Sequence, residues 1–251
     1  MVYFVGAGPG DKELITVKGL RLLSNADSVI YAGSLINIEL LDYTKKNCKL
    51  YDSAKMTLEE VFAVMKSNEE NSYITVRLHT GDPSIYGAIR EQIDLLIQHN
   101  IDFEVIPGVS SFLGAAASMG IEYTLPGISQ TVILTRMEGR TPVPETEKIE
   151  LLAKAQASMI IFLSSGMLEQ LSEKLIEGGY DKDTPAAIVY KATWADEKII
   201  KTTIQDLAEA GRDIKKTALI LAGRFLGDNY ERSLLYHPEF THGYRTGKEN
   251  E

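Results

Sequence analysis

Strand-like and helix-like segments alternate along almost the whole chain, and this alternation limits the possible folds more than any other feature. Residues 2–8 predict a strand, residues 11–27 a helix with apolar side chains at helical spacing, and residues 28–33 a second strand. The Pro126-Gly127 pair interrupts the pattern, which restarts at residue 130. Because such alternation favours mainly parallel sheets covered by helices, we predict an α/β protein of two domains with an active-site cleft between them.

The predicted boundaries follow this interruption. An N-terminal α/β domain would span residues 1–126, a C-terminal α/β domain residues 127–240, and a polar tail residues 241–251. The strand at 196–204 is expected to form a hairpin with the strand at 184–192. The other predicted elements are helices at 57–68, 87–99, 111–120, 146–156, 167–179 and 204–211, and strands at 72–79, 102–108, 130–136, 157–166 and 217–225.

Composition restricts the partners. The 251 residues carry 26 basic and 35 acidic side chains, a formal charge of −9, which argues against general nucleic-acid binding. A polyanionic substrate would therefore need a local basic patch. The single cysteine, Cys48, forms no internal disulfide, no apolar run is long enough to span a bilayer, and no secretory leader pattern opens the chain. These features favour a cytoplasmic protein.

The first loop, VGAGPGD (5–11), has its glycines at Gly6, Gly8 and Gly10. A dinucleotide fingerprint reads G-x-G-x-x-G and is followed by an acidic residue after the second strand. Here the third glycine comes one residue early, and SVIYAG (28–33) supplies no acid. A nicotinamide-dependent oxidoreductase is therefore a weak alternative. A tight glycine turn, with Asp11 capping the next helix, explains the loop equally well.

Two further loops follow strands. TGDPSIYG (80–87) offers Gly81 for close backbone approach, Asp82 as a fixed acceptor and Pro83 to start the next helix. PGVSS (107–111) places Ser110 and Ser111 at the start of a helix, where exposed amides and hydroxyls suit a polar ligand. Either serine could instead be only the helix cap.

In this order and spacing, VGAGPGD, TGDPSIYG and PGVSS resemble the tetrapyrrole methylases, the class III S-adenosylmethionine-dependent methyltransferases. The resemblance covers nearly the whole chain. In the second half, TRMEGRTPVPETEKIELLA (135–153), SMIIFLSSGM (158–167) and AAIVYKATWADEKII (186–200) are similar to the precorrin-4 C-11 methyltransferases of corrin biosynthesis. Another tetrapyrrole methylase, acting on a different precorrin or on uroporphyrinogen III, is the alternative within the family.

The resemblance implies a set of site residues. The methyl donor S-adenosylmethionine, which leaves as S-adenosylhomocysteine, would be held by Pro9, Thr80, Gly81, Asp82, Tyr86, Ser110, Ser111, Ser164, Ala192 and Ala222. The substrate would lie against Gly8, Gly10, Asp11, Arg136 and Arg140. Asp82 would position the donor and its loop rather than move a proton. The resemblance also implies a homodimer, a polycarboxylate tetrapyrrole as substrate, and any cobalt arriving inside that substrate.

Basic residues are needed to meet the substrate's carboxylates. Arg136 precedes the proline-rich loop GRTPVPETE (139–147) and Arg140 lies at its start, and both are candidate carboxylate clamps. The alternative is that they pair with Glu138, Glu145 or Glu147 and only stiffen the loop. The remaining basic candidates are Lys12, Arg21, Arg77, Arg90 and Lys191.

The other conspicuous side chains suggest no second chemistry. Trp194, the only tryptophan, is expected to pack rather than to form a ligand platform. The four histidines, at 79, 99, 237 and 242, show no metal-ligand spacing, so no metal site is expected, and His79 beside the TGDP turn is expected to be packed. Methyl transfer to an enamine-like carbon depends mainly on alignment, so no acid–base pair is required. A non-catalytic tetrapyrrole carrier is the remaining alternative.

Overall fold

The computed structural model describes residues 1–247, which form two compact units. Of the described residues, the first unit contains Met1–Ser118 together with Lys191–Glu197, and the second contains Met119–Tyr190 and 198–247. This division differs from the predicted spans 1–126 and 127–240. It falls earlier in the chain, and a short segment from the second half belongs to the first unit. Residues 248–251 of the predicted tail lie outside the described residues.

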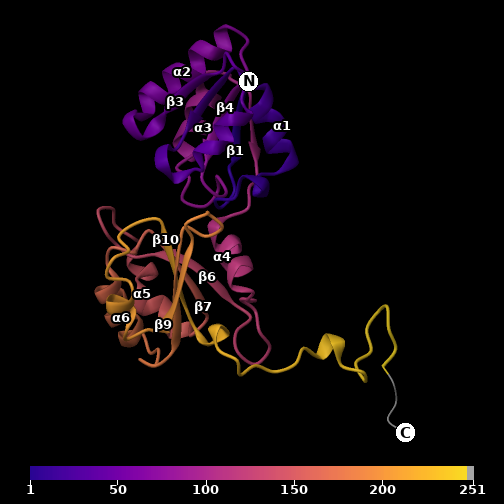
Figure 1. Cartoon of the computed structure of the whole chain (residues 1–251), viewed down its shortest axis with the longest axis vertical. Helices are drawn as coiled ribbons and strands as arrows, with labels where there is room; N and C mark the ends of the chain where they lie inside the picture. Colours follow the sequence, from indigo (N-terminus) through magenta and orange to yellow (C-terminus); the bar gives the residue numbers. More distant parts are fainter. Residues whose placement is uncertain (248–251) are drawn as a thin grey trace. The chain divides into compact units, whose positions relative to one another are not determined.

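The first unit is built on a five-stranded sheet with the order β3-β2-β4-β1-β5, and all of its pairings are parallel (Figure 1). This confirms the parallel α/β prediction for this half. The strand β3 was not predicted from the sequence. The elements are β1 (Val2–Gly6), α1 (Val17–Asn25), β2 (Ser28–Tyr31), β3 (Lys49–Asp52), α2 (Leu58–Glu70), β4 (Thr75–His79), α3 (Arg90–Gln98), β5 (Phe103–Ile106) and α4 (Ser111–Met119).

Helices cover both faces of this sheet because neighbouring residues of each strand point to opposite sides. On β1, Val5 packs in a cluster that includes Leu23 of α1, whereas Phe4 packs in another that includes Met65 of α2 and Leu96 of α3. Thr57 caps α2 in a capping box with Glu60, as the sequence pattern indicates.

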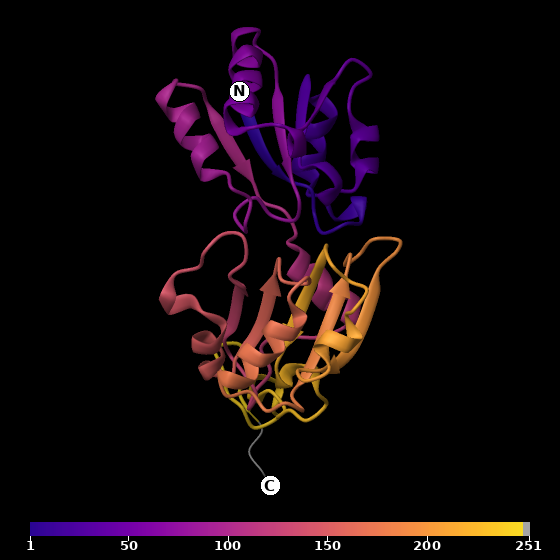
Figure 2. The same cartoon turned by 90° about the vertical axis from the view of Figure 1, so that its left-hand side faces the viewer.

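The second unit contains a five-stranded sheet with the order β6-β7-β10-β8-β9, seen side by side in Figure 2. Its elements are β6 (Val132–Arg136), α5 (Ile149–Leu152), β7 (Ser158–Phe162), α6 (Leu168–Glu177), β8 (Pro185–Tyr190), β9 (Lys198–Thr203), α7 (Leu207–Ala210) and β10 (Ala218–Ala222). Short 3₁₀ turns connect elements in both units, including Lys12–Leu14 and Glu145–Glu147.

This second sheet is mixed. β6 and β7 pair in parallel, whereas β10 is antiparallel to both β7 and β8, and β9 is antiparallel to β8. The predicted hairpin of β8 and β9 is confirmed. The expectation of a mainly parallel sheet fails here because β10 inserts between β7 and β8 in the opposite direction. A core that includes Ile149, Leu171 and Leu207 packs α5, α6 and α7 onto the sheet.

Candidate functional site

Three loops of the first unit meet at the carboxyl ends of β4, β1 and β5, which are neighbours in the sheet. The Gly8 amide donates to the Gly81 carbonyl at 3.3 Å, and the Gly81 amide donates back to the Gly8 carbonyl at 2.9 Å. The glycine-rich loop and the TGDP loop are therefore joined backbone to backbone.

Glycines allow these loops to approach so closely. A Cβ on Gly108 would lie 2.2 Å from the Gly81 carbonyl oxygen, and one on Gly6 would lie 2.5 Å from the Gly108 Cα. Gly81 also has a φ of +58°, in the left-handed region. The contacts at Gly6 and Gly108 involve backbone atoms, which cannot rotate away as a side chain can. The three loops at this sheet edge are thus packed against one another.

Asp82 fastens this edge through its carboxylate. Oδ2 accepts from the Gly108 amide at 2.8 Å, while Oδ1 accepts from the amide of Ser84 at 2.8 Å and from its hydroxyl. Burial raises the pKa of Asp82, but the hydrogen bonds from Ser84 and Gly108 outweigh it and leave the pKa below its ordinary value. This arrangement supports a positioning role for Asp82.

Replacing Asp82 with asparagine is expected to lower the free energy of unfolding by about 1–3 kcal/mol at pH 7. One carboxylate oxygen that accepts a hydrogen bond would become an NH₂ group, and this donor would face a backbone N–H donor. Asp82 has a lowered folded-state pKa, so its contribution is present above the unfolded value of about 3.8 and is lost as the pH falls through the lower folded value. Urea unfolding of wild type and Asp82→Asn from pH 7 to pH 3 should show the difference shrinking at the acidic end.

A pH-independent difference would contradict this assignment. Asp82→Leu, which removes every acceptor, should also weaken donor binding strongly, whereas Asp82→Asn should retain measurable turnover. Loss of all turnover in Asp82→Asn with normal donor affinity would instead indicate an ionised catalytic role.

The start of α4 lies beside the TGDP loop. A Cβ on Gly81 would be 3.4 Å from both the Ser110 Cα and the Ser111 amide nitrogen. The Ser110 carbonyl accepts from the amides of Leu113 and Gly114, so Ser110 sits at the cap position and is itself buried. The first turn of any helix leaves amide groups without an intrahelical acceptor. This edge therefore offers backbone donors to a polar ligand, next to exposed Thr80.

The segment 191–197 covers the glycine-rich loop. Trp194 Nε1 donates to the Pro9 carbonyl at 3.0 Å, and the Asp11 amide donates to the Thr193 hydroxyl at 3.0 Å. A Cβ on Gly10 would lie 2.0 Å from the Trp194 ring, so this glycine makes room for the indole. Trp194 is thus a packing residue, as expected. Asp11 also caps the turn Lys12–Leu14 by accepting from the Glu13 amide.

The predicted donor and substrate residues of the first unit therefore gather around one sheet edge. Gly8, Pro9 and Gly10 are buried, which shows a structural use for the glycines that the sequence assigned to the substrate. Tyr86 is 47% exposed and has a φ of 54°. A non-glycine residue in the left-handed region is strained, and such strain often marks functional loops. Ala192 is buried in the covering segment, with its carbonyl beside Gly10.

Arg136, the last residue of β6, is turned onto its own loop. Its guanidinium donates to three carbonyls, those of Met137 at 3.1 Å, Thr141 at 3.2 Å and Pro142 at 2.7 Å. The structure therefore shows none of the three glutamate pairings considered for Arg136. Instead, Arg136 stiffens the proline-rich loop through backbone acceptors. Arg140 is exposed on that loop and makes no hydrogen bond or ion pair with the residues described.

Ser164 links the ends of β6 and β7. Its hydroxyl donates to the Phe162 carbonyl at 2.7 Å and accepts from the Met137 amide at 3.0 Å. Ala222 lies elsewhere. Because β10 is antiparallel, Ala222 pairs with Met159 and Ala186 near the amino ends of β7 and β8. The sequence placed Ala222 with Ser164 in the donor site, and the reversed direction of β10 instead puts it at the opposite edge of this sheet.

The other basic candidates have different environments. Arg77 is buried, where it donates to Gln92 and to the Ile30 carbonyl, and desolvation lowers its pKa to about 10. This burial makes it a structural residue. Arg21 is exposed on α1. The remaining three form exposed or half-exposed ion pairs: Lys12 with Glu39, Arg90 with Asp94, and Lys191 with Asp196.

His79 is packed in the first unit, as expected. It is 4% exposed and lies against the Phe4 ring with the centroids 6.0 Å apart. Burial, with a smaller contribution from the Arg77 charge, lowers its pKa to about 3, so it is neutral at physiological pH. Between residues 1 and 247, no cluster of three or more His, Cys, Asp or Glu side chains is placed to hold a metal ion. In the same range no helix has the length and apolarity needed to cross a membrane.

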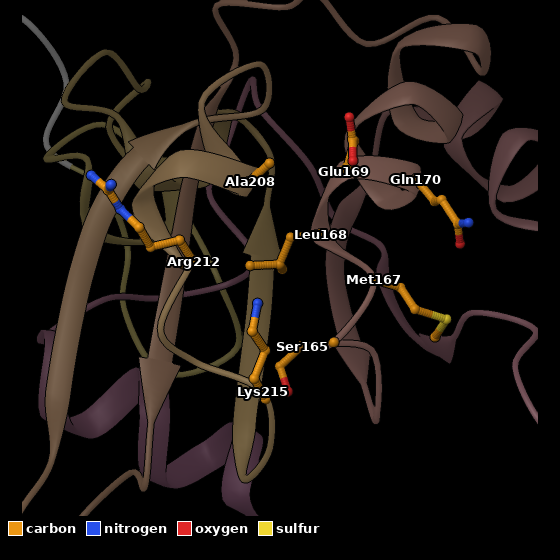
Figure 3. A pocket seen from close by; sticks show the side chains of 10 residues that line it. Ser165, Met167, Leu168, Glu169, Gln170, Ala208, Arg212 and Lys215 are labelled. Carbon is orange, nitrogen blue, oxygen red and sulfur yellow. The ribbon is translucent and has the colours of Figure 1, made fainter.

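Sequence reasoning passed over one group of polar residues. Ser165, Arg212 and Lys215 line a cavity of about 310 Å³ in the second unit (Figure 3). The available signal was the basic run GRDIKK (211–216) directly before the last predicted strand.

Comparisons with known proteins agree with this geometry. The family model described as Tetrapyrrole (Corrin/Porphyrin) Methylases matches residues 1–208. A protein of Methanocaldococcus jannaschii named cobalt-precorrin-4 C(11)-methyltransferase is 55% identical over 247 residues, covering 97% of this chain and 95% of the relative. A protein of the same name from Priestia megaterium is 48% identical over 256 residues, covering 100% and 99%.

Solved structures are also similar to this chain. The X-ray structure of a cobalt precorrin-4 methyltransferase matches with a TM-score of 0.89 and 48% identity, covering 90% of this chain and 96% of that one. A uroporphyrin-III C-methyltransferase from Thermus thermophilus, complexed with S-adenyl homocysteine, matches with a TM-score of 0.75 and 26% identity, covering 90% and 98%.

Proposed function

Because this chain belongs to the tetrapyrrole methylase family, we propose that it transfers a methyl group from S-adenosylmethionine to C-11 of cobalt-precorrin-4, giving cobalt-precorrin-5. The observation that carries the proposal is the 55% identity, over 97% of this chain, to a protein named for that reaction. The second relative, at 48% identity, is also named for the cobalt-containing substrate. Cobalt would enter as part of that substrate.

The donor would be held at the carboxyl edge of the first sheet. Exposed Thr80 and the amides at the start of α4 offer the hydrogen-bond donors that suit the carboxylate of an amino-acid group, and Gly81 allows the close approach of these two segments. Asp82 and Pro9 would act by holding the loops, and Tyr86 and Ala192 by bordering them. Ser164 is the donor-site candidate in the second unit. The S-adenyl homocysteine complex of the Thermus thermophilus relative supports this choice of donor.

The donor supplies an electrophilic methyl group on a sulfonium sulfur. The chain's contribution would be alignment of the reacting carbon, methyl and sulfur, which can account for ~7–11 kcal/mol of the barrier. Rigid loops suit this task, and the backbone contacts among Gly6, Gly81 and Gly108 make this edge rigid. Exclusion of water from the sulfonium would add to the effect. His79, neutral and buried, takes no part.

Arg140 is the better of the two predicted clamps for a substrate carboxylate. Its guanidinium is exposed and makes no bond within residues 1–247, whereas Arg136 already donates to three carbonyls. We also propose a cytoplasmic location, a homodimer, and no nucleic-acid or membrane partner. The formal charge of −9 supports the absence of nucleic acid, and sedimentation velocity would test the dimer.

Mass spectrometry of the product tests the function. The protein is incubated with S-adenosylmethionine and, in separate reactions, cobalt-precorrin-4, metal-free precorrin-4 and uroporphyrinogen III. One added methyl group on cobalt-precorrin-4, located at C-11 by NMR, is the expected result. Methylation of uroporphyrinogen III alone would favour the alternative within the family. Tetrapyrrole binding without methyl transfer would favour a carrier, and tighter binding of NAD than of S-adenosylhomocysteine would favour an oxidoreductase.

A further inference from the structure

A cavity of about 310 Å³ opens at the start of α6 in the second unit (Figure 3). Its walls are the loop after β7, the first turn of α6 and the segment between α7 and β10. A Cβ on Gly166 would lie 3.6 Å from the Lys215 carbonyl, so the two segments are adjacent. The cavity lies beyond the carboxyl end of β7. At that end, Phe162 of β7 pairs with Arg136 at the end of β6.

Positive charge and backbone donors converge on this cavity. The cap residue Met167 supplies no side-chain acceptor to α6, a helix of 10 residues, so its first-turn amides remain available. The positive end of the helix dipole lies at the same place. Lys215 adds one cationic side chain, whereas the Arg212 side chain extends away from Ser165 and Lys215 in Figure 3 and pairs with Glu209. Glu169 also borders the cavity, but its side chain extends away from Ser165 and Lys215 in Figure 3.

Ser165 provides an independent indication of a ligand. The residue lines the cavity and is only 5% exposed, yet its hydroxyl makes no hydrogen bond with any residue between 1 and 247. Its oxygen is not among the fully buried polar atoms that lack a partner in the described residues, so this unbonded hydroxyl faces the cavity. This hydroxyl lies beside Lys215 and a helix N-terminus and has no acceptor in the described residues, and an anion in the cavity would supply one.

We propose that this cavity is a carboxylate subsite that takes one acetate or propionate arm of the tetrapyrrole substrate. Ser165, Lys215 and the first-turn amides of α6 would donate to the carboxylate. A protein of net charge −9 needs such a local basic site to attract a polyanion. The assignment of the carboxylate to the substrate, but not the subsite itself, rests on the proposed function.

The test uses the full chain and uroporphyrin, a stable porphyrin with acetate and propionate arms. Fluorescence titration compares wild type with Ser165→Ala, Lys215→Gln and the control Lys182→Gln. Lys182 is exposed and precedes β8, at the opposite edge of the sheet. We expect Lys215→Gln to raise Kd about tenfold or more and Ser165→Ala about threefold to tenfold, with Lys182→Gln unchanged.

Ser165→Ala removes no bond within the chain, so its Tm should equal that of wild type. Pocket variants that bind like wild type, or a control that weakens binding as much as Lys215→Gln, would overturn the subsite. S-adenosylhomocysteine affinity is measured in parallel, because the donor also carries a carboxylate. Weakened S-adenosylhomocysteine binding with unchanged porphyrin binding would overturn the substrate assignment. Absence of methyl transfer by wild type would count against the proposed function alone.

Discussion

Replacing Gly108 with alanine is expected to lower the free energy of unfolding by about 3 kcal/mol, since the new Cβ overpacks a rigid backbone contact. That Cβ would lie 2.2 Å from the Gly81 carbonyl oxygen and close to the Gly6 backbone. For a chain of 251 residues such a loss corresponds to a fall in Tm of ~6–12 °C. Because the same three loops would hold the donor, S-adenosylhomocysteine binding should also be lost or greatly weakened.

Differential scanning calorimetry and titration calorimetry measure the two effects. The control is Gly139→Ala, where the nearest atom to the added Cβ is the Met167 terminal methyl carbon at 3.6 Å, an ordinary contact. Gly139→Ala should leave Tm within about 2 °C of wild type, as surface substitutions usually do. If Gly108→Ala behaved like this control, the three loops could not be packed as tightly as the structure has them.

Replacing Arg140 with alanine is expected to raise the substrate KM about tenfold to a hundredfold, the effect of losing one charge-assisted hydrogen bond to a carboxylate. Its Tm should not change, since the exposed guanidinium makes no bond within residues 1–247. Arg140→Lys should recover only part of the affinity, because an ammonium lacks the bidentate fork. Steady-state kinetics with cobalt-precorrin-4 would measure the change, and S-adenosylhomocysteine affinity should stay constant.

Arg136→Ala provides the contrast. Its three carbonyl acceptors would lose their donor, so this variant should lower Tm as well as disturb the loop. An unchanged KM in Arg140→Ala would remove Arg140 from the substrate site. An increased KM in Arg140→Lys as large as in Arg140→Ala would show that fork geometry, rather than charge alone, accounts for the whole effect.

Local periodicity was enough to predict much of this protein. Two strands joined by a helix usually run in the same direction. The parallel first sheet and the loops at its carboxyl edge therefore follow from the order of the elements. Glycine, proline and small polar residues marked those loops, because these residues favour the backbone conformations of tight turns. The hairpin of β8 and β9 could also be predicted, because its two strands are close in sequence.

Contacts between segments that are distant in sequence were decided by the tertiary structure alone. Trp194 bonds to Pro9, 185 positions away, and this contact places 191–197 in the first unit and explains Gly10. The insertion of β10 between β7 and β8 moved Ala222 to the far edge of its sheet. The cavity around Ser165 and Lys215 likewise needs two loops brought together. Sequence periodicity records which face of an element is buried, but strand order and side-chain partners depend on how the whole chain packs.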